Sequence, residues 1–287
     1  MEAPELSVVI PAFNAEATLA DQLEALARQT DPGSFEVVVV DNRSTDRTRD
    51  VAQAFASRLP LRIVDAFQRA GEPHARNVGL AEAASDKIAF CDADDVVGRG
   101  WVAAMSRALD THSLVTGPLE LTELNPPWVL ATRTNPQPDR PQNKYGFLPH
   151  AAGANLGVNR KAAQAVGGFD ESLPSLPDTD FCWRMQLAGH ELHFAADAVV
   201  HYRLRHDTRG VVRQARAYAV ADVALHRRYE PQGMPPLRLT SGLKGWVRLF
   251  AGLPLLASRS GRFRYAWMLG FRLGRLEGAF RYRVLVL

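Results

Sequence analysis

Three acidic side chains stand within four positions at the end of an apolar run. Asp92, Asp94 and Asp95 follow the stretch 87–91. Their negative charges repel one another unless a positive group compensates them. Carboxylate oxygens suit hard cations such as Mg²⁺ or Mn²⁺, which usually complete their shells with water and substrate phosphates. An ordinary turn, in which aspartate is common, would account for the same residues.

Further polar candidates follow other apolar runs or begin helices. Asp41 ends the run 35–41, where it could accept hydrogen bonds from a nucleobase or ribose, and Phe13 offers a flat surface for base stacking. Arg76 stands early in an expected helix, where arginine and backbone N–H groups suit phosphate, unless it is a solvated surface residue.

The second half of the chain adds two carboxylates and a histidine. Asp178 and Asp180 begin an expected helix, and two residues apart they point in different directions. One can cap the helix while the other faces a cleft as a general base for a substrate hydroxyl. His201 ends an apolar run, where a histidine is usually structural, but a neutral imidazole can also complete a metal shell.

The elements that must position these residues alternate along the first hundred positions. Apolar runs and helical spacing predict strands over 6–11, 35–41, 61–64 and 87–92, with helices over 15–29, about 47–55 and about 74–84. This alternation predicts an α/β fold with a mostly parallel sheet. Ligands bind beyond the carboxyl ends of such strands, so the polar residues at Pro11–Asn14, Asp41 and Asp92–Asp95 should converge.

The later segments are less regular. Residues 119–152 contain six prolines and several aromatic side chains, which indicates a functional loop or lid, with simple disorder as the alternative. Helical patterns return over 159–166 and 179–188, and short strands are expected over 191–195 and 198–202.

The composition is that of an ordinary globular protein. The 287 residues are 46% hydrophobic and 23% charged, which excludes collagen-like, coiled-coil and disordered classes. Two cysteines cannot form a disulfide scaffold, and no cluster has zinc spacing. Neither a signal peptide nor a membrane-spanning helix is expected, so we expect a cytoplasmic protein.

The charge is divided along the chain. Residues 1–200 contain 17 Lys and Arg against 27 Asp and Glu, whereas residues 201–287 contain 17 against 4. The basic part is either a solvated face or a contact for an anionic partner such as membrane lipid or a phosphorylated substrate. No recognition motif accompanies it, so nucleic acid is not expected as a partner.

Taken in order, seven segments resemble the family 2 glycosyltransferases, which have the GT-A fold. The resemblance covers about residues 6–230 and rests on SVVIPAFNAEATL, VVVDNRSTDRT, GEPHARNVGLAEA, IAFCDADD, NLGVNRKAAQAVGGFDESL, DTDFCWRMQLAGHEL and AVVHY. It implies a catalytic domain over 1–230, with a nucleotide-binding part of about 1–98 and an acceptor part of about 99–230.

The resemblance also implies roles for single residues. Asp178 would be the catalytic base and His201 would lie near a divalent metal, Mn²⁺ or Mg²⁺. Pro177 stands where the family often has glutamate, which bears on acceptor binding. The nucleotide sugar and the metal would be held by Pro11, Phe13, Asn14, Asp41, Arg76 and the D-x-D pair Asp92 and Asp94.

The activity that this resemblance implies is metal-dependent, inverting transfer of a single sugar from a nucleotide-diphosphate sugar. The acceptor is an unidentified hydroxyl, on a cell-envelope glycan, a lipid-linked molecule or a small molecule. Residues 213–218 lack the Q-x-x-R-W signature of processive synthases. A nucleotidyltransferase is disfavoured because no glycine-rich phosphate loop follows the first strand, and a non-catalytic sugar-nucleotide-binding module is the third hypothesis.

The tail, residues 231–287, is expected to be helical. Residues 241–287 carry nine Lys and Arg and one acid, Glu277, but the arginines of 262–283 do not gather on one helical face. The tail is expected to pack on the catalytic domain or on another subunit. Peripheral contact with the inner face of an anionic membrane is the alternative.

Overall fold

The first four strands form a parallel sheet, as the sequence predicts. The computed structural model describes residues 3–173, 175–237 and 239–284. In it the strands lie in the order β3-β2-β1-β4, and every pair among them is parallel. Their bounds are β1 Leu6–Ala12, β2 Phe35–Asp41, β3 Leu61–Asp65 and β4 Lys87–Phe90. The connecting helices are α1 Leu19–Ala27, α2 Thr48–Gln53 and α3 Glu72–Glu82.

The core explains why β2 is a run of valines. Val37 to Val40 are all fully buried, with Val37 and Val39 in the core cluster on one face of the sheet and Val38 and Val40 in the cluster on the other. A parallel sheet covered on both faces requires apolar residues at consecutive positions rather than alternate ones. Helices therefore cover both faces, and the strand ends are left to carry polar residues.

Three later strands extend this sheet. β8 (Leu156–Asn159) runs antiparallel to β4 and to β6 (Leu114–Thr116), and β9 (Leu192–Phe194) pairs in parallel with β6. The sequence patterns did not predict β6, β8 or helix α4 (Trp101–Leu109). The helix expected from residue 159 is α6 (Arg160–Ala165), and the Asn159 side chain caps it by accepting the Ala162 N–H.

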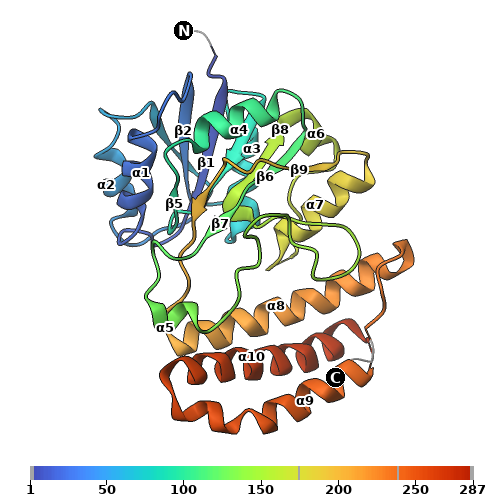
Figure 1. Cartoon of the computed structure of the whole chain (residues 1–287). Coiled ribbons are helices and arrows are strands. Elements are labelled where there is room, and N and C mark those ends of the chain that lie inside the picture. The colour runs from blue at the N-terminus through green and yellow to red at the C-terminus, as the bar shows by residue number, and fades with distance from the viewer. Residues whose placement is uncertain (1–2, 174, 238, 285–287) are drawn as a thin grey trace.

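A second, small sheet crosses the carboxyl end of the main one. β10 (Val200–His201) pairs with β5 (Val96–Val97) on one side and with β7 (Leu119–Glu120) on the other. It brings residues 200–203 beside the acidic segment that follows β4. Helix α7 (Pro177–Leu187) lies on the same side of the molecule as α6 (Figure 1).

The proline-rich segment 119–152 is packed, so the alternative of simple disorder is wrong. It contains β7 and the short helix α5 (Pro127–Leu130), and an isolated bridge joins Gln142 to His150. The rings of Tyr145 and Phe147 both meet Trp183 of α7 edge-on, with centroids 5.1 and 5.4 Å away. Burial of its aromatic side chains gives this segment a defined path.

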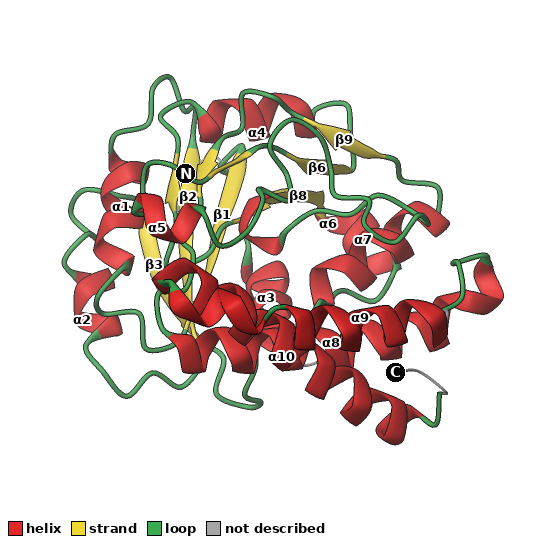
Figure 2. Ribbon diagram, turned by 60° about the horizontal axis from the view of Figure 1, so that its bottom comes forward, coloured by secondary structure: helices red, strands yellow, loops and turns green. Residues whose placement is uncertain are grey.

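The C-terminal third forms a layer of helices beyond the carboxyl ends of the strands (Figures 1 and 2). α8 (Thr208–Tyr229) lies nearest the sheet, α10 (Arg259–Tyr282) packs along it, and α9 (Leu239–Ala251) is outermost. The expected packing of a helical tail on the rest of the chain is confirmed. None of the helices in the described ranges is long and apolar enough to cross a membrane.

Candidate active site

The three carboxylates after β4 lie together. One carboxylate oxygen from each of Asp92, Asp94 and Asp95 lies within 4.8 Å of the others. Asp94 is exposed, Asp92 is partly exposed and Asp95 is buried. Crowding by surrounding protein atoms raises the pKa of all three groups, although the Asp94 side chain reaches solvent, and the neighbouring carboxylates raise those of Asp92 and Asp95 further. A divalent cation would offset this repulsion, so the donor set fits Mg²⁺ or Mn²⁺.

A residue that the sequence analysis did not single out holds this acidic turn in place. The Arg203 backbone N–H donates to Asp95 Oδ1 at 2.7 Å, and Arg203 Nε donates to the Asp94 carbonyl oxygen at 2.8 Å. Asp95 Oδ2 is buried without a hydrogen-bond partner among the described residues. The small sheet thus ties the turn to the strand that carries His201.

His201 lies beside the acidic turn but outside the carboxylate cluster. It pairs with Val96 across the small sheet, and its Nδ1 lies 2.9 Å from Glu120 Oε2. Although burial raises the pKa of Glu120, hydrogen bonds from His201, Thr122 and Glu123 lower it to about 2. An ionised carboxylate only accepts, so Nδ1 donates to it, and in a neutral imidazole Nε2 is then the nitrogen that can bind a metal.

Arg76 is buried, so its interpretation as a solvated surface arginine is wrong. The side chain is 1% exposed, and Nη2 contacts Asp92 Oδ1 at 3.0 Å and Glu72 Oε1 at 2.6 Å. A buried guanidinium requires such counter-charges. Glu72, which the sequence analysis passed over, keeps about half of its side chain exposed. Arg76 lowers its pKa, but crowding by protein atoms and the charges of Asp92 and Asp178 raise it to about 7.

Neither aspartate of α7 caps the helix, contrary to the expectation. The helix begins at Pro177, after Leu176 in the left-handed conformation. The two carboxylates do point in different directions. Asp178 Oδ2 accepts the Gly153 N–H at 2.8 Å, whereas Asp180 is fully buried and pairs with Arg184 and with Arg228 of α8.

Gly153 connects Asp178 to Arg76. A Cβ atom at this position would collide with the Arg76 guanidinium, so the backbone that donates to Asp178 packs directly on that group. A continuous series of contacts therefore runs from Asp92 through Arg76 and Gly153 to Asp178. Only a glycine permits this approach, and the sequence analysis carried no signal for it.

Two further side chains, from α8 and from the proline-rich segment, respond to the charge of Asp178. Burial and the charges of Asp178 and Glu72 raise the pKa of Tyr218, which α8 contributes. Surrounding protein lowers the pKa of Lys144, and Asp178 is among the charges that act on it. The charge of Asp178 therefore acts on two residues that the sequence analysis did not single out.

The expected nucleotide residues lie at the same edge of the sheet, because Ala12 pairs with Asp41 and Val9 with Phe90. Asp41 is 1% exposed, and its oxygens accept from the Ser44 N–H and from Arg49. Asn14 Oδ1 accepts the Thr45 N–H, and Pro11 is a residue of β1. Phe13 is 63% exposed, so its ring is open to solvent.

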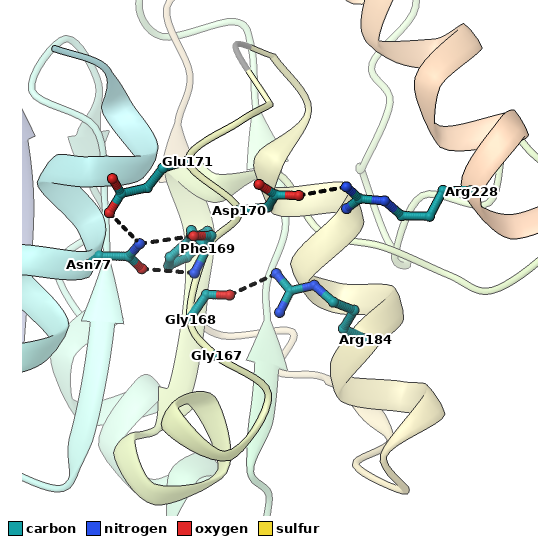
Figure 3. A pocket seen from close by; sticks show the side chains of 8 residues that line it. All are labelled: Asn77, Gly167, Gly168, Phe169, Asp170, Glu171, Arg184 and Arg228. Carbon is teal, nitrogen blue, oxygen red and sulfur yellow. Dashed lines mark hydrogen bonds and ion pairs between the residues drawn. The ribbon is translucent and has the colours of Figure 1, made fainter. Parts of the chain in front are cut away.

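A separate pocket contains none of the residues expected to be functional. Its volume is about 450 Å³, and Figure 3 shows the side chains that line it pairing with one another. Asn77 bonds to Phe169 and Glu171, and Arg228 pairs with Asp170. These groups are satisfied within the protein, so the pocket has the character of a packing junction between α3, α7 and α8.

Comparison with known proteins identifies the family of this chain. Residues 7–167 match the model of the family described as glycosyl transferase family 2. The chain belongs to this family. It is 32% identical over 207 residues to glycosyltransferase AglE of Haloferax volcanii, covering 68% of this chain and 66% of the relative. It is 26% identical over 260 residues to the pre-mycofactocin glycosyltransferase of Mycobacterium tuberculosis, covering 88% of this chain and 54% of the relative.

Solved structures share the fold of this family 2 protein. The mannosyltransferase PcManGT from Pyrobaculum calidifontis, in complex with GDP-Man and Mn²⁺, superposes with a TM-score of 0.65 at 19% identity over 96% of this chain and 88% of that one. Staphylococcus aureus TarS 1–349 in complex with UDP-GlcNAc superposes with a TM-score of 0.57. The two sequences are 17% identical, and the superposition covers 97% of this chain and 92% of the TarS chain. The GT-A fold expected from the sequence is confirmed. The chain spans about half to two thirds of the length of the curated relatives named above.

Proposed function

We propose that this family 2 protein is a metal-dependent, inverting glycosyltransferase that moves a single sugar from a nucleotide-diphosphate sugar to an acceptor hydroxyl. The observation that carries the proposal is the series of contacts from the acidic turn at Asp92 through Arg76 and Gly153 to Asp178. This series supports a cation-binding group at one end of the site and a candidate base at the other.

The donor would bind at the acidic turn and at the carboxyl ends of β1 and β2. Asp92 and Asp94, with His201 beside them, would hold the divalent ion, Mn²⁺ or Mg²⁺, which when bound neutralises charge on the leaving nucleoside diphosphate. Phe13 would stack on the base, with Pro11, Asn14 and Asp41 framing it, since a carboxylate oxygen can accept more than one hydrogen bond. Arg76 would face the diphosphate. The GDP-Man and UDP-GlcNAc complexes of the structural neighbours support a donor of this class.

At the acceptor end, Asp178 would take the proton from the incoming hydroxyl. That oxygen forms its bond to the anomeric carbon as the bond from this carbon to the diphosphate oxygen breaks on the opposite face, which inverts the configuration. The N–H groups of Gly153 and Thr179, each at 2.8 Å, orient the carboxylate for this role.

The acceptor is proposed as a hydroxyl of a cell-envelope glycan, a lipid-linked molecule or a small molecule. Two relatives are named for different acceptors, pre-mycofactocin and poly(ribitol-phosphate), so membership of the family leaves the acceptor open. We propose that residues 1–230 form the catalytic domain and that the enzyme works in the cytoplasm. There its basic tail, residues 231–287, would contact the inner face of a membrane.

Thermal unfolding with nucleotides tests the donor site. A nucleoside diphosphate or nucleotide sugar together with Mn²⁺ should raise the melting temperature more than either alone, because binding stabilises the folded state. Asp94→Ala should remove the Mn²⁺ dependence. If no nucleotide stabilises the protein with or without Mn²⁺, the proposal is wrong.

Transfer kinetics test the base. Asp178→Asn should keep nucleotide binding and lose transfer by about 10²–10⁴-fold, the usual contribution of a positioned base. Wild-type turnover in this variant would refute the assignment. Nucleotide binding by the unaltered protein without any transfer or donor hydrolysis would instead favour a non-catalytic binding module.

A further inference from the structure

Helix α9 turns most of its large apolar side chains away from the protein. Four of them follow the spacing i, i+4, i+8 and i+11, which places them on one face of the helix. The 3₁₀ segment η3 (Leu253–Ala257) continues this face. The exposed side chains, each between 41% and 66% exposed, are Leu239, Leu243, Val247, Phe250, Leu253 and Leu256.

The inner face of α9 contains two glycines and one leucine. Gly242 and Leu249 are buried, and a Cβ atom at Gly245 would collide with Arg272 of α10. A surface helix in water normally buries its large apolar residues and exposes its polar ones. α9 departs from this pattern, because its glycines let it approach α10 closely while four of its six large apolar side chains face outward.

The position of α9 makes this face accessible. Figure 1 shows α9 as the outermost helix of the C-terminal layer, with α8 and α10 between it and the carboxyl edge of the sheet. In Figure 2 the same layer lies in front of the sheet. A contiguous exposed apolar surface of this kind marks an interaction site rather than a solvated face.

The charge around this face indicates which kind of partner it would bind. Within the described residues 239–284 the sole acid is Glu277, and its carboxylate is paired with Arg216 at 2.6 Å. The surrounding side chains, among them Lys244 and Arg248 on α9 itself, are basic. Two such faces would repel each other in a dimer of this chain, whereas an anionic lipid surface attracts them.

We infer that the outward face of α9 and η3 docks on the surface of an anionic membrane. Its apolar side chains lie at headgroup level and its lysine and arginines lie against lipid phosphates. This inference deepens the proposed function, and rests on the membrane contact proposed there. The helical layer then separates the lipid from the active site at the sheet edge.

Vesicle sedimentation of the full chain tests the inference. We expect the protein to pellet at low salt with vesicles of phosphatidylcholine and phosphatidylglycerol, and much less with phosphatidylcholine alone or in 0.5 M salt. Val247→Glu with Phe250→Glu should lower the bound-to-free ratio at least tenfold. Leu187→Glu, at a leucine on α7 that is 49% exposed, should leave the ratio unchanged. The inference would be overturned if the double variant pelleted as well as the wild type, or if the wild type did not pellet. It would also be overturned if light scattering showed that the wild type is a dimer and the double variant a monomer.

A second measurement needs no destabilising variant. Trp246 lies on α9 beside Phe250, with ring centroids 6.5 Å apart, so brominated lipids should quench the fluorescence of the unaltered protein more than that of Trp246→Phe. Equal quenching of the two proteins would count against docking through α9. Nucleotide-induced thermal stabilisation separates the two proposals, because it can succeed or fail independently of vesicle binding.

Discussion

At the scale of single residues, the site depends on charges that compensate one another inside the protein. Arg76 is surrounded by Asp92, Glu72 and, through Gly153, Asp178. Without the guanidinium these carboxylates would repel one another in partly desolvated surroundings. The arginine therefore determines both the shape and the charge of the region between the donor and acceptor ends.

Replacing this arginine should affect stability and activity together. Arg76→Met should lower the free energy of unfolding by about 3 kcal/mol, the lower end of the range for breaking a buried pair, because Asp92 stays partly accessible. Urea unfolding measures this loss. Arg76→Lys, which keeps the charge but has a single donor group, should lose less. Equal unfolding midpoints for wild type and Arg76→Met would contradict this role.

A buried histidine gives the protein a defined pH dependence. His150 is 2% exposed, and burial, with Lys144 beside it, lowers its pKa from 6.5 to about 3. Below pH 6.5, His150 binds a proton in the unfolded chain but stays neutral in the folded protein. The free energy of unfolding therefore decreases as the pH falls from 6.5 toward 3. Between pH 7 and pH 5 the loss should be about 2 kcal/mol.

His150→Phe supplies the test of that dependence. The ring contacts with Tyr145 and Trp183 can persist in this variant, but the titrating group is gone. Chemical unfolding at pH 7 and pH 5 should show a smaller difference than in the wild type. An unchanged difference would mean that other groups produce the pH dependence.

At the scale of elements, glycines decide how the helical layer assembles. Gly270, Gly274 and Gly278 recur every four residues on the face of α10 that meets α8. A side chain at Gly274 would collide with the Arg216 carbonyl and with Ala219. The small residues let the two backbones approach, and α8 also carries Tyr218, whose ring meets Trp267 of α10 edge-on.

Gly274→Leu should therefore destabilise the protein through overpacking, by about 1–3 kcal/mol. Thermal or chemical unfolding measures the loss. Gly100→Leu is a matched control, because nothing lies within 4 Å of a Cβ atom there and its φ is negative. Similar losses in the two variants would show that the glycine face is not what joins α10 to α8.

At the scale of the whole molecule, the acidic site and the basic helical layer form a continuous structure. α10 packs on α8 and also reaches α5, where Ser260 donates to the Trp128 carbonyl at 2.7 Å and Arg259 lies 3.7 Å from the centroid of the Trp128 ring. The C-terminal residues thus cover the part of the chain that carries Tyr218 and the proline-rich segment.

Removal of residues 231–287 should consequently expose apolar surface on α8. Ala215 and Ala219, which Gly270 and Gly274 of α10 contact, would lose their cover. Light scattering of residues 1–230 should show aggregation, and the melting temperature should fall. A monomeric fragment with the melting temperature of the full chain would show that the tail is an independent appendage.

Local patterns were sufficient for the parallel half of the sheet. β1, β2, β3 and β4 are apolar runs bounded by turn residues, and a buried strand between two helix layers requires such a run wherever it lies. The acidic turn after β4 was visible for the same reason, because charged residues stand out against a buried strand. These features depend on neighbours within about ten positions.

Contacts between distant segments decided the rest. β8 pairs antiparallel with β4, Gly153 lies against Arg76, and the Glu120 carboxylate holds His201 from 81 positions away. The type of a residue does not reveal a partner that is distant in the sequence. A glycine or a glutamate has the same backbone preference whether or not a distant group contacts it. The identity and spacing of side chains therefore determine which faces of each helix or strand are apolar or polar. Only the packing of the whole chain determines which of these faces contact one another and which, like the outer face of α9, remain exposed.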